Sequence, residues 1–315
     1  MTTNNSHTRL SQSDIAIQIE RLVKGIEQHD TPAFRFRGGR SQQERIEDTR
    51  LTRHFDHIQQ MVDLFDDRCD YSYSEHLQAF WNACQDIGIV RGLQGPVCLN
   101  EQGTSYLDHH RSMNVLVARI RQLISQLWYR RKKGDLRSQA RDSERAVIKY
   151  TDAILERYSR TIIVRVDLYY RSAAQARLRV EHVFDDLDQL VGVRKQNPIF
   201  DHEIGYICSV EQGEGRGFHI HAAFFFKGDE VRGDIHKAQQ IGELWERITR
   251  GQGCFNSCNH NKESYGDMLG IGLIKRSDHE ARRQVHYVMR YLVKDDQQVL
   301  VKPLRAKCLR KGLAR

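Results

Sequence analysis

The sequence predicts an α+β protein in which a helical N-terminal region precedes an antiparallel sheet. Apolar residues recur at a helical period in several stretches of the first 150 residues. Near residue 160 the pattern changes to runs rich in β-branched and aromatic residues, which are typical of strands, and helical patterns alternate with these runs. A chain of 315 residues has room for one large or two modest domains with ample core.

The helices expected in the first 150 residues are marked by three apolar stripes, which we expect to pack against one another. The first stripe follows Ser13 and Asp14, a pair suited to capping a helix. A basic, glycine-containing segment at 35–40 interrupts the pattern and is predicted to be a loop. The stripes consist of Ile15, Ile19, Leu22, Val23 and Ile26, then Leu51, Phe55, Ile58, Val62 and Phe65, and then Val115, Leu116, Ile120, Leu123, Ile124 and Leu127.

Beyond residue 160 the predicted order of elements is β-α-β-β-α-β-α. This order is typical of a split-βαβ, ferredoxin-like antiparallel sheet with one extra helix. The predicted elements are, in chain order, a strand at 161–170, a helix at 178–191, a strand at 204–211, a turn at 213–217 that leads into a strand containing His219, a helix at 234–249, a strand at 268–274, and a helix that begins near Asp278.

The composition is that of an ordinary globular protein with a moderately basic balance. Hydrophobic residues make up 39% of the chain, charged residues make up 29%, and the net charge is +8. No apolar run approaches the roughly 18 residues that a membrane helix needs, and the first residues do not resemble a secretory signal, so no membrane partner is expected. The seven cysteines are scattered and odd in number, which favours a reducing cytoplasm over a disulfide framework.

Two histidines in the segment 217–226 predict a metal site. Alternate side chains of a strand share a face, so His219 and His221 project side by side from an otherwise apolar ribbon. If the preceding turn is centred on Gly215, Glu211 lies opposite His219 in the hairpin. Burying three such groups without partners would be costly. An open site of two imidazoles and one carboxylate suits Mg²⁺ or Mn²⁺ when phosphate oxygens and water complete the coordination.

A second group of chemically active residues lies on the predicted C-terminal helix. Tyr287, Tyr291 and Lys294 are spaced at i, i+4 and i+7, so they share one face of the helix. A tyrosine on an amphipathic helix is by itself more often a packing residue. Beside a metal site, however, a phenol can attack phosphorus, and Lys294 can support the developing negative charge or hold the DNA backbone. The two groups together predict a metal-assisted phosphodiester transesterase with a tyrosine nucleophile.

The order of these motifs resembles that of the HUH endonuclease superfamily, the rolling-circle replication initiators and their relatives. Within it, the chain is most similar to the inovirus replication endonucleases of the gene-two-product type, also called the YagK/YfjJ C-terminal domain family. The likeness covers roughly residues 155–298, and although each motif is short, their order and spacing make the set specific. The segments that carry it are Val-Arg-Val-Asp-Leu at 164–168, Gly-Phe-His-Ile-His at 217–221, Leu-Trp-Glu-Arg-Ile-Thr at 244–249 with the glycines after it, and Tyr-Leu-Val-Lys at 291–294.

The resemblance implies a site-specific nickase that acts on single-stranded or locally melted DNA at an origin. Its tyrosine would attack a phosphodiester, become linked to the 5′ phosphate, and leave a free 3′ hydroxyl that primes rolling-circle replication of a phage, plasmid or satellite element. The positions that match the motifs make His219, His221 and Glu211 metal ligands and Tyr291 the nucleophile. Tyr287 would be the second tyrosine of the two-tyrosine initiators, or a packing residue.

The chain departs from the superfamily at its first motif, which usually ends in a strand that bears threonine or serine. Asp167 stands there instead, on the same strand face as Arg165 and Tyr169. Asp167 either orients a metal-bound histidine through a hydrogen bond or has a structural role at the strand end. The two cysteines in 254–260 lack the spacing and the fourth ligand of a zinc site, and a loop with free thiols is expected there.

The prediction is completed by a helical accessory region at 1–150 for DNA or partner binding, an endonuclease domain at 155–298 and a flexible basic tail at 299–315. Because the chain has no Walker-type phosphate loop, a host helicase and a host polymerase are expected to act with it in the cytoplasm of a bacterial host. The basic run at 130–133 fits a nucleic-acid footprint and a solvated helix end equally well. Residues that would add salt-dependent affinity for phosphates are Arg130, Arg131, Lys132, Lys133, Lys302, Arg305 and Lys307.

Two other functions are compatible with the sequence. A transposase or relaxase would use the same chemistry on another mobile element. A nucleic-acid-binding regulator on the same fold would no longer cut DNA. Such a regulator is expected to have lost the metal ligands or the tyrosine, and this chain retains both.

Overall fold

The computed structural model describes residues 10–38, 44–65, 70–293 and 298–313. Its internal contacts divide the chain into two compact units, residues 1–135 with 300–304 and residues 136–299 with 305–315. Both units combine helices with antiparallel strands, so the predicted α+β class is confirmed. Helix α5, Leu127–Arg157, begins in the first unit and continues into the second.

In the first unit, helices pack their apolar stripes against one another. Helices α1, α3 and α4 are in mutual contact, and Ile19 and Leu116 are fully buried. Ser11, rather than the predicted Ser13 and Asp14, caps the first helix, because its hydroxyl accepts a hydrogen bond from the Asp14 amide at 3.1 Å. The elements are α1 (Gln12–Gln28), the 3-10 turn η1 (Thr52–His54), α2 (Ile58–Asp63), α3 (Glu75–Asp86) and α4 (His109–Ile124).

Short two-stranded ribbons in the first unit correct the purely helical prediction. The loop predicted at 35–40 is wrong for residues 34–37, which form a strand, while Gly39 and Arg40 lie outside the described residues. The alternation Phe-Arg-Phe-Arg has the period of a strand, but four residues are too few to distinguish it from a loop. The ribbons pair β1 (Phe34–Arg37) with β2 (Arg45–Asp48), β4 (Val90–Gly92) with β5 (Gly95–Val97), and β3 (Tyr71–Tyr73) with β11 (Val301–Pro303).

The second unit is built on an antiparallel sheet whose described strands have the order β10-β6-β8-β7-β12, with β9 also paired to β6. Strand β8 lies between β6 and β7, and all its residues except Lys227 are buried. This central position explains its almost continuous apolar sequence, since both of its faces are covered. The strands are β6 (Arg160–Tyr170), β7 (Glu203–Gly213), β8 (Gly217–Lys227), β9 (Gly253–Ser257), β10 (Gly272–Lys275) and β12 (Leu309–Lys311).

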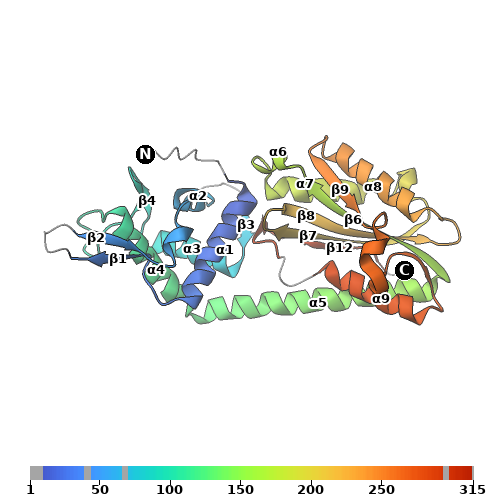
Figure 1. Ribbon diagram of the computed structural model, residues 1–315, viewed down its shortest axis with the longest axis horizontal. Coiled ribbons are helices and arrows are strands. Elements are labelled where there is room, and N and C mark those ends of the chain that lie inside the picture. Colours follow the sequence, from blue (N-terminus) through green and yellow to red (C-terminus); the bar gives the residue numbers. More distant parts are fainter. Residues whose placement is uncertain (1–9, 39–43, 66–69, 294–297, 314–315) are drawn as a thin grey trace. The chain divides into compact units, whose positions relative to one another are not determined.

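Helices cover both faces of this sheet, with α7 and α8 on one face and α5 and α9 on the other (Figure 1). On the α5–α9 face, Phe225 of β8 belongs to one cluster with Ile154 of α5 and Val288 of α9. On the opposite face, Tyr170 of β6 contacts Trp245 of α8. The helical elements are α6 (Ser172–Gln175), α7 (Val180–Val193), η2 (Pro198–Phe200), α8 (Asp234–Ile248), η3 (Lys262–Met268) and α9 (His279–Tyr291).

Three segments of the second unit differ from the prediction. The strand predicted at 268–274 begins only at Gly272, after the 3-10 turn η3. Strand β9 forms where a loop is expected, because five residues of mixed polarity gain their hydrogen bonds by pairing with β6. The predicted flexible tail is also wrong for its described residues, since it supplies β11 and β12. Edge strands of three to five residues have too little pattern to be recognised without their partners.

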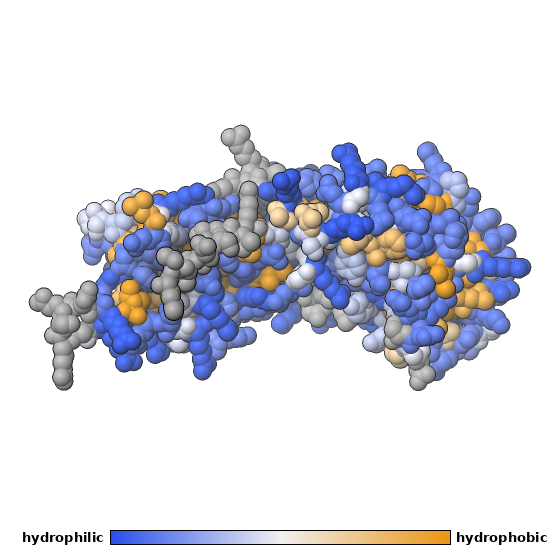
Figure 2. Space-filling model, turned by 45° about the horizontal axis from the view of Figure 1, so that its top comes forward, coloured by the Kyte–Doolittle hydropathy of each residue, from blue (hydrophilic) through white to orange (hydrophobic). Residues whose placement is uncertain are grey.

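The surface is predominantly hydrophilic on the face drawn in Figure 2, where apolar residues form only small groups. In the part of the chain that the structure describes, no helix has the length and apolar character needed to cross a membrane.

Candidate metal centre and tyrosine site

The β7–β8 hairpin brings three polar side chains to one place on the α5–α9 face of the sheet. Glu211 lies directly opposite His219, which confirms the register predicted from a turn centred on Gly215. His221 lies two residues further along β8 on the same face. Gly215 and Gly217 have φ angles of 71° and 65°, and such left-handed backbone is readily adopted only by glycine. The turn sequence therefore fixes the register that assembles the site.

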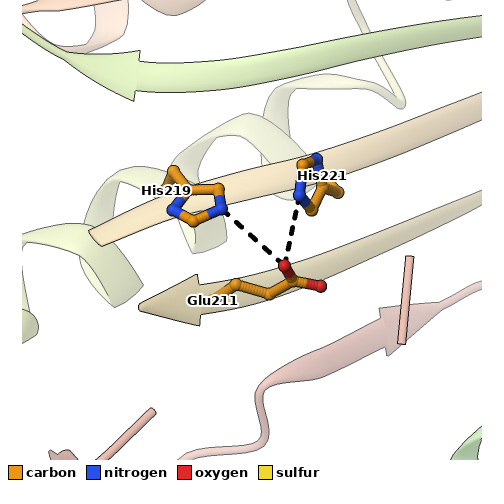
Figure 3. A group of neighbouring side chains, drawn as sticks. All are labelled: Glu211, His219 and His221. Carbon is orange, nitrogen blue, oxygen red and sulfur yellow. Dashed lines mark ion pairs between the residues drawn. The ribbon is translucent and has the colours of Figure 1, made fainter. Parts of the chain in front are cut away.

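The two imidazoles turn the same nitrogen toward Glu211 (Figure 3). The Nε2 atoms of His221 and His219 lie 3.1 Å and 3.7 Å from the Glu211 Oε2 atom. The Nδ1 atoms point elsewhere: that of His219 lies 3.2 Å from the Gly217 carbonyl oxygen, and that of His221 lies 2.5 Å from Asp167 Oδ1. Each Nδ1–H donates to these oxygens, which directs both Nε2 atoms at the space beside Glu211.

These atoms are deeply buried and incompletely satisfied. Glu211 is 2% exposed, and both histidines are 1% exposed. Among the described residues, neither Nε2 atom and neither carboxylate oxygen of Glu211 has a hydrogen bond of acceptable geometry, although His221 and Glu211 are close. Unpaired polar atoms at such depth are costly. One atom from each residue lies within 4.8 Å of the others, so the group can hold a metal ion.

The electrostatics of the two histidines differ in a way that follows from their partners. Burial, together with the nearby His221, lowers the pKa of His219 to about 4, so its imidazole is neutral at neutral pH. Burial also acts to lower the pKa of His221, but the hydrogen bond to Asp167 and the nearby carboxylates of Asp167 and Glu211 outweigh it and raise that pKa to about 9. Burial is also the main cause of a raised pKa at Glu211. A dicationic metal would displace these protons.

Asp167 lies next to the candidate metal centre, beside His221. Burial acts to raise its pKa, but the hydrogen bond from His221 and the neighbouring Arg165 hold it below its ordinary value. Its second oxygen lies 3.4 Å from the Tyr169 hydroxyl, and the Tyr169 ring stacks on His219 with 5.7 Å between ring centroids. Of the two roles considered for Asp167, a hydrogen bond with a histidine is present: His221 Nδ1 donates to Asp167 Oδ1.

The two tyrosines of α9 lie in different surroundings. The Tyr291 ring lies 5.4 Å from the His221 ring, centroid to centroid. Tyr287, one turn earlier, is 53% exposed, and both tyrosines line a surface cavity together with Glu144 and Arg290. The structure therefore brings Tyr291, but not Tyr287, into contact with the histidine pair. Lys294 lies outside the described residues.

Arg165 is a site residue that the sequence argument names but gives no role. Its guanidinium carbon lies 4.7 Å from the centre of the Tyr291 ring. One terminal nitrogen lies 3.5 Å from Asp167 Oδ1, and the other lies 3.2 Å from the Tyr265 hydroxyl oxygen. The side chain is 5% exposed, and its Nε has no hydrogen-bond partner among the described residues. The strand alternation that places Arg165 on the face of Asp167 was the available signal, whereas nothing in the sequence singles out Tyr265.

The predicted basic residues are not among the contacts of the histidine pair. Arg130 and Arg131 are exposed on α5, and the Lys133 ammonium lies 3.1 Å from Glu27 within the first unit. Burial lowers the pKa of the partly buried Lys132. Lys302 lies in β11, and Arg305 and Lys307 are exposed on the segment between β11 and β12.

The segment 254–260 contributes to the site through one thiol rather than through zinc ligation. Cys254 lies in β9, and the Sγ atom of Cys258 lies 3.7 Å from Asp167 Oδ2. Burial raises the pKa of the Cys258 thiol to about 11, which favours the protonated form that donates to a carboxylate.

Comparison with known proteins identifies a family. No curated protein and no solved structure is significantly similar to the chain. The family model of the YagK/YfjJ C-terminal domain matches residues 123–303, which is more than half of the chain. The match includes all of α5, the strands β6 to β11 and helix α9, and therefore all three residues of the candidate metal centre and Tyr291. The chain belongs to the YagK/YfjJ C-terminal domain family.

Proposed function

We propose that the protein is a metal-dependent, site-specific single-strand DNA endonuclease of the HUH type, similar to the inovirus replication endonucleases. The observation that carries the proposal is the contact between the Tyr291 ring and His221, whose Nε2 is directed, with that of His219, at Glu211. A phenol beside a candidate metal centre suits an attack on a phosphodiester that the centre would hold.

The sheet supports the same assignment. Its central hairpin, β7–β8, carries the candidate ligands, and α9, which bears the tyrosine, packs on the same face. We assign this arrangement to the ferredoxin-like fold of the HUH nucleases, with β9 and β12 as additional strands beside β6 and β7.

His219, His221 and Glu211 would hold the metal, for which Mg²⁺ or Mn²⁺ is proposed because phosphate and water oxygens would complete the coordination. When bound, the metal would withdraw electron density from a non-bridging phosphate oxygen. Asp167 accepts the hydrogen bond from His221 Nδ1 and so would orient the Nε2 atom toward the metal.

The reaction proposed for Tyr291 is a transesterification. The phenol loses its proton, a bond forms between its oxygen and phosphorus, and the bond from phosphorus to the 3′ oxygen breaks. The 3′ oxygen takes up a proton and leaves as a free hydroxyl, while the 5′ phosphate stays linked to the tyrosine. Arg165, stacked on the Tyr291 ring, is the described cation placed to stabilise negative charge that develops on the phenol oxygen and the phosphate.

The biological setting is proposed from the resemblance to the replication endonucleases. The free 3′ hydroxyl would prime rolling-circle replication of a phage, plasmid or satellite element by a host polymerase in the bacterial cytoplasm. Because the site is deeply buried, its substrate is proposed to be an extruded single strand at an origin, opened with the help of a host helicase.

The proposal is tested by incubating the full-length protein with labelled single-stranded oligonucleotides that include candidate origin sequences, in the presence of Mn²⁺. A protein–DNA adduct that resists denaturation is scored by gel electrophoresis. Wild type is compared with Tyr291→Phe, with the matched control Tyr287→Phe, and with the double variant His219→Ala/His221→Ala.

Tyr291→Phe and the histidine variant are expected to reduce adduct formation by at least about 1000-fold, because the nucleophile or the metal ligands are lost. Tyr287→Phe is expected to retain it. Adduct formation that persists in Tyr291→Phe and disappears in Tyr287→Phe would reverse the choice of nucleophile. No adduct with any oligonucleotide would reject the nuclease and leave a non-catalytic nucleic-acid-binding protein.

A further inference from the structure

A cavity of ≈ 560 Å³ opens in the second unit at the end of the sheet opposite the metal centre. It lies beside the first residues of β7 and the last residue of β8, Lys227, whereas His219 is near the beginning of β8. The C-terminal part of α5, the residues that follow α7, Phe200 of η2 and the segment at 312–313 also line it. None of its lining residues belongs to the metal centre or to the surroundings of Tyr291.

The residues that line the cavity carry an excess of positive charge. Arg157, Arg194, Lys195 and Lys227 face a single carboxylate, that of Glu203, within the described lining. Glu203 is already engaged, because its Oε1 accepts a hydrogen bond of 2.7 Å from the Arg194 Nη1. Lys195 and Lys227 are exposed and form no ion pair among the described residues, so their charges remain available to an anion. The excess of positive charge favours an anionic ligand.

Arg194 gives the cavity a fixed donor. Its guanidinium carbon lies only 3.5 Å from the centre of the Tyr206 ring, and its side chain is 11% exposed. The bond to Glu203 and the stacking on Tyr206 together hold the group in place. Its Nε, however, is buried and has no hydrogen-bond partner among the described residues. Arg194 therefore contributes a fixed positive charge to the wall of the cavity.

The cavity is also lined by aromatic rings. Tyr158 and Tyr206 are half-buried, while Tyr150 is almost fully buried. The Tyr150 hydroxyl fits against backbone that lacks side chains: a Cβ at Gly205 or at Gly312 would lie 2.5 Å or 2.3 Å from it. Accessible aromatic rings beside cations are the arrangement that binds a base and its phosphate together.

We propose that this cavity binds a nucleoside phosphate, with the base against the tyrosine rings and the phosphate among Arg194, Lys195 and Lys227. The ligand is either a free nucleotide or one residue of a single DNA strand, since both present the same base and phosphate. The site does not depend on the proposed nicking reaction, because it uses none of the residues assigned to that reaction.

The test measures binding of dTMP and of the single-stranded pentamer (dT)₅ to the full-length protein by isothermal titration calorimetry. EDTA is present throughout, so that no divalent metal occupies the histidine site. The variant is Lys195→Ala/Lys227→Ala, which removes two exposed charges from the cavity. The matched control is Arg247→Ala, which removes an exposed charge from α8 at a residue that does not line the cavity. Thermal unfolding verifies that both variants fold as wild type does.

The double variant is expected to weaken binding by roughly tenfold, while Arg247→Ala leaves it unchanged. An effect on dTMP and (dT)₅ alike identifies a free-nucleotide site, and an effect on (dT)₅ alone identifies a site for a residue of the strand. The proposal would be overturned if the double variant bound each ligand as tightly as wild type does. It would also be overturned if Arg247→Ala lost as much affinity as the double variant. Inorganic phosphate that competes as well as dTMP would also overturn it, because the rings would then contribute nothing.

Discussion

The imidazole of His221 is held from both sides, by Asp167 at Nδ1 and by Glu211 at Nε2, and only the second position is suited to a metal. Replacing Asp167 with asparagine keeps the size of the side chain but removes the charge that polarises the imidazole. We expect Asp167→Asn to weaken Mn²⁺ binding by about 10- to 100-fold, measured by isothermal titration calorimetry. Ser257→Ala, in the neighbouring strand β9, serves as a control and is expected to bind as wild type does. Unchanged affinity in Asp167→Asn would mean that the carboxylate does not support a ligand.

His221 also predicts how metal binding depends on pH. In the metal-free protein the pKa of His221 is raised to about 9, and burial raises the pKa of Glu211. Both groups bind a metal only after they lose a proton, so Mn²⁺ affinity should rise as the pH is increased from 6 to about 9. His219, with a pKa lowered to about 4, contributes no change in this range. The check is the affinity across this pH range, together with proton release in buffers of different ionisation enthalpy. A flat profile would contradict the assignment of His221.

Replacing Arg165 with lysine keeps the positive charge and removes the planar guanidinium, so it separates the effects of charge and shape. Its planar guanidinium stacks on Tyr291 while it contacts Asp167 and Tyr265, a geometry that an ammonium group cannot reproduce. Arg165→Lys is therefore expected to slow adduct formation by about 100-fold while Mn²⁺ affinity stays within about twofold of wild type. Single-turnover adduct kinetics and calorimetry measure the two quantities. Equal losses in both would indicate that the arginine acts by holding Asp167 rather than by supporting the reaction.

Among the secondary-structure elements, the β7–β8 hairpin depends most directly on its turn. Gly217 has a φ of 65°, and its carbonyl oxygen accepts the hydrogen bond from His219 Nδ1. Gly217→Ala would place a Cβ 2.4 Å from the Gln175 side chain, in a backbone conformation that alanine resists. We expect a loss of about 1–2 kcal/mol in the free energy of unfolding and weaker Mn²⁺ binding. Chemical denaturation measures the first effect, and Gly251→Ala, at another positive φ but with no atom close to its Cβ, tests strain without the contact. Equal losses in the two variants would show that the contact with Gln175 has no effect.

The sequence predicts the elements that have a long hydrophobic pattern or a turn that requires glycine. The register of Glu211 and His219 follows from Gly215, and helices α7, α8 and α9 begin within two residues of their predicted positions. The remaining strands depend on partners that are distant in sequence. β9 and β12 exist because they pair with β6 and β7, and such pairing leaves no periodic signal in five or three residues. Likewise, the stacking of Arg165 on Tyr291 joins residues 126 positions apart, which no local pattern reveals.

At the scale of the whole molecule, the C-terminal segment returns to both compact units. Residues 300–304 belong to the first unit, where β11 pairs with β3, and residues 305–315 belong to the second, where β12 pairs with β7. The segment is basic, as the sequence indicates, but its described part is ordered by strand pairing. Its contribution to stability can therefore be separated from its contribution to charge.

Deleting residues 305–315 is expected to destabilise the second unit. The deletion removes backbone hydrogen bonds from the Val210 amide to Cys308 and from the Gly312 amide to Tyr206, at 3.0 Å and 3.1 Å, and the ion pair of Arg310 with Asp188. It also leaves β7 as an unprotected edge, which promotes association between chains. With each backbone bond contributing about 1 kcal/mol, the free energy of unfolding should fall by a few kcal/mol.

Differential scanning calorimetry and light scattering measure the stability and the association of the truncated chain. The double variant Arg305→Ala/Lys307→Ala keeps β12 but removes two exposed charges, so it separates the two contributions of the segment. It should unfold at the wild-type temperature while its affinity for single-stranded DNA becomes weaker and less dependent on salt, because fewer counterions are released. If the truncated chain unfolds as wild type does, the pairing of β12 with β7 contributes nothing to stability. Strand β7 would then hold Glu211 in place through its pairing with β8 alone.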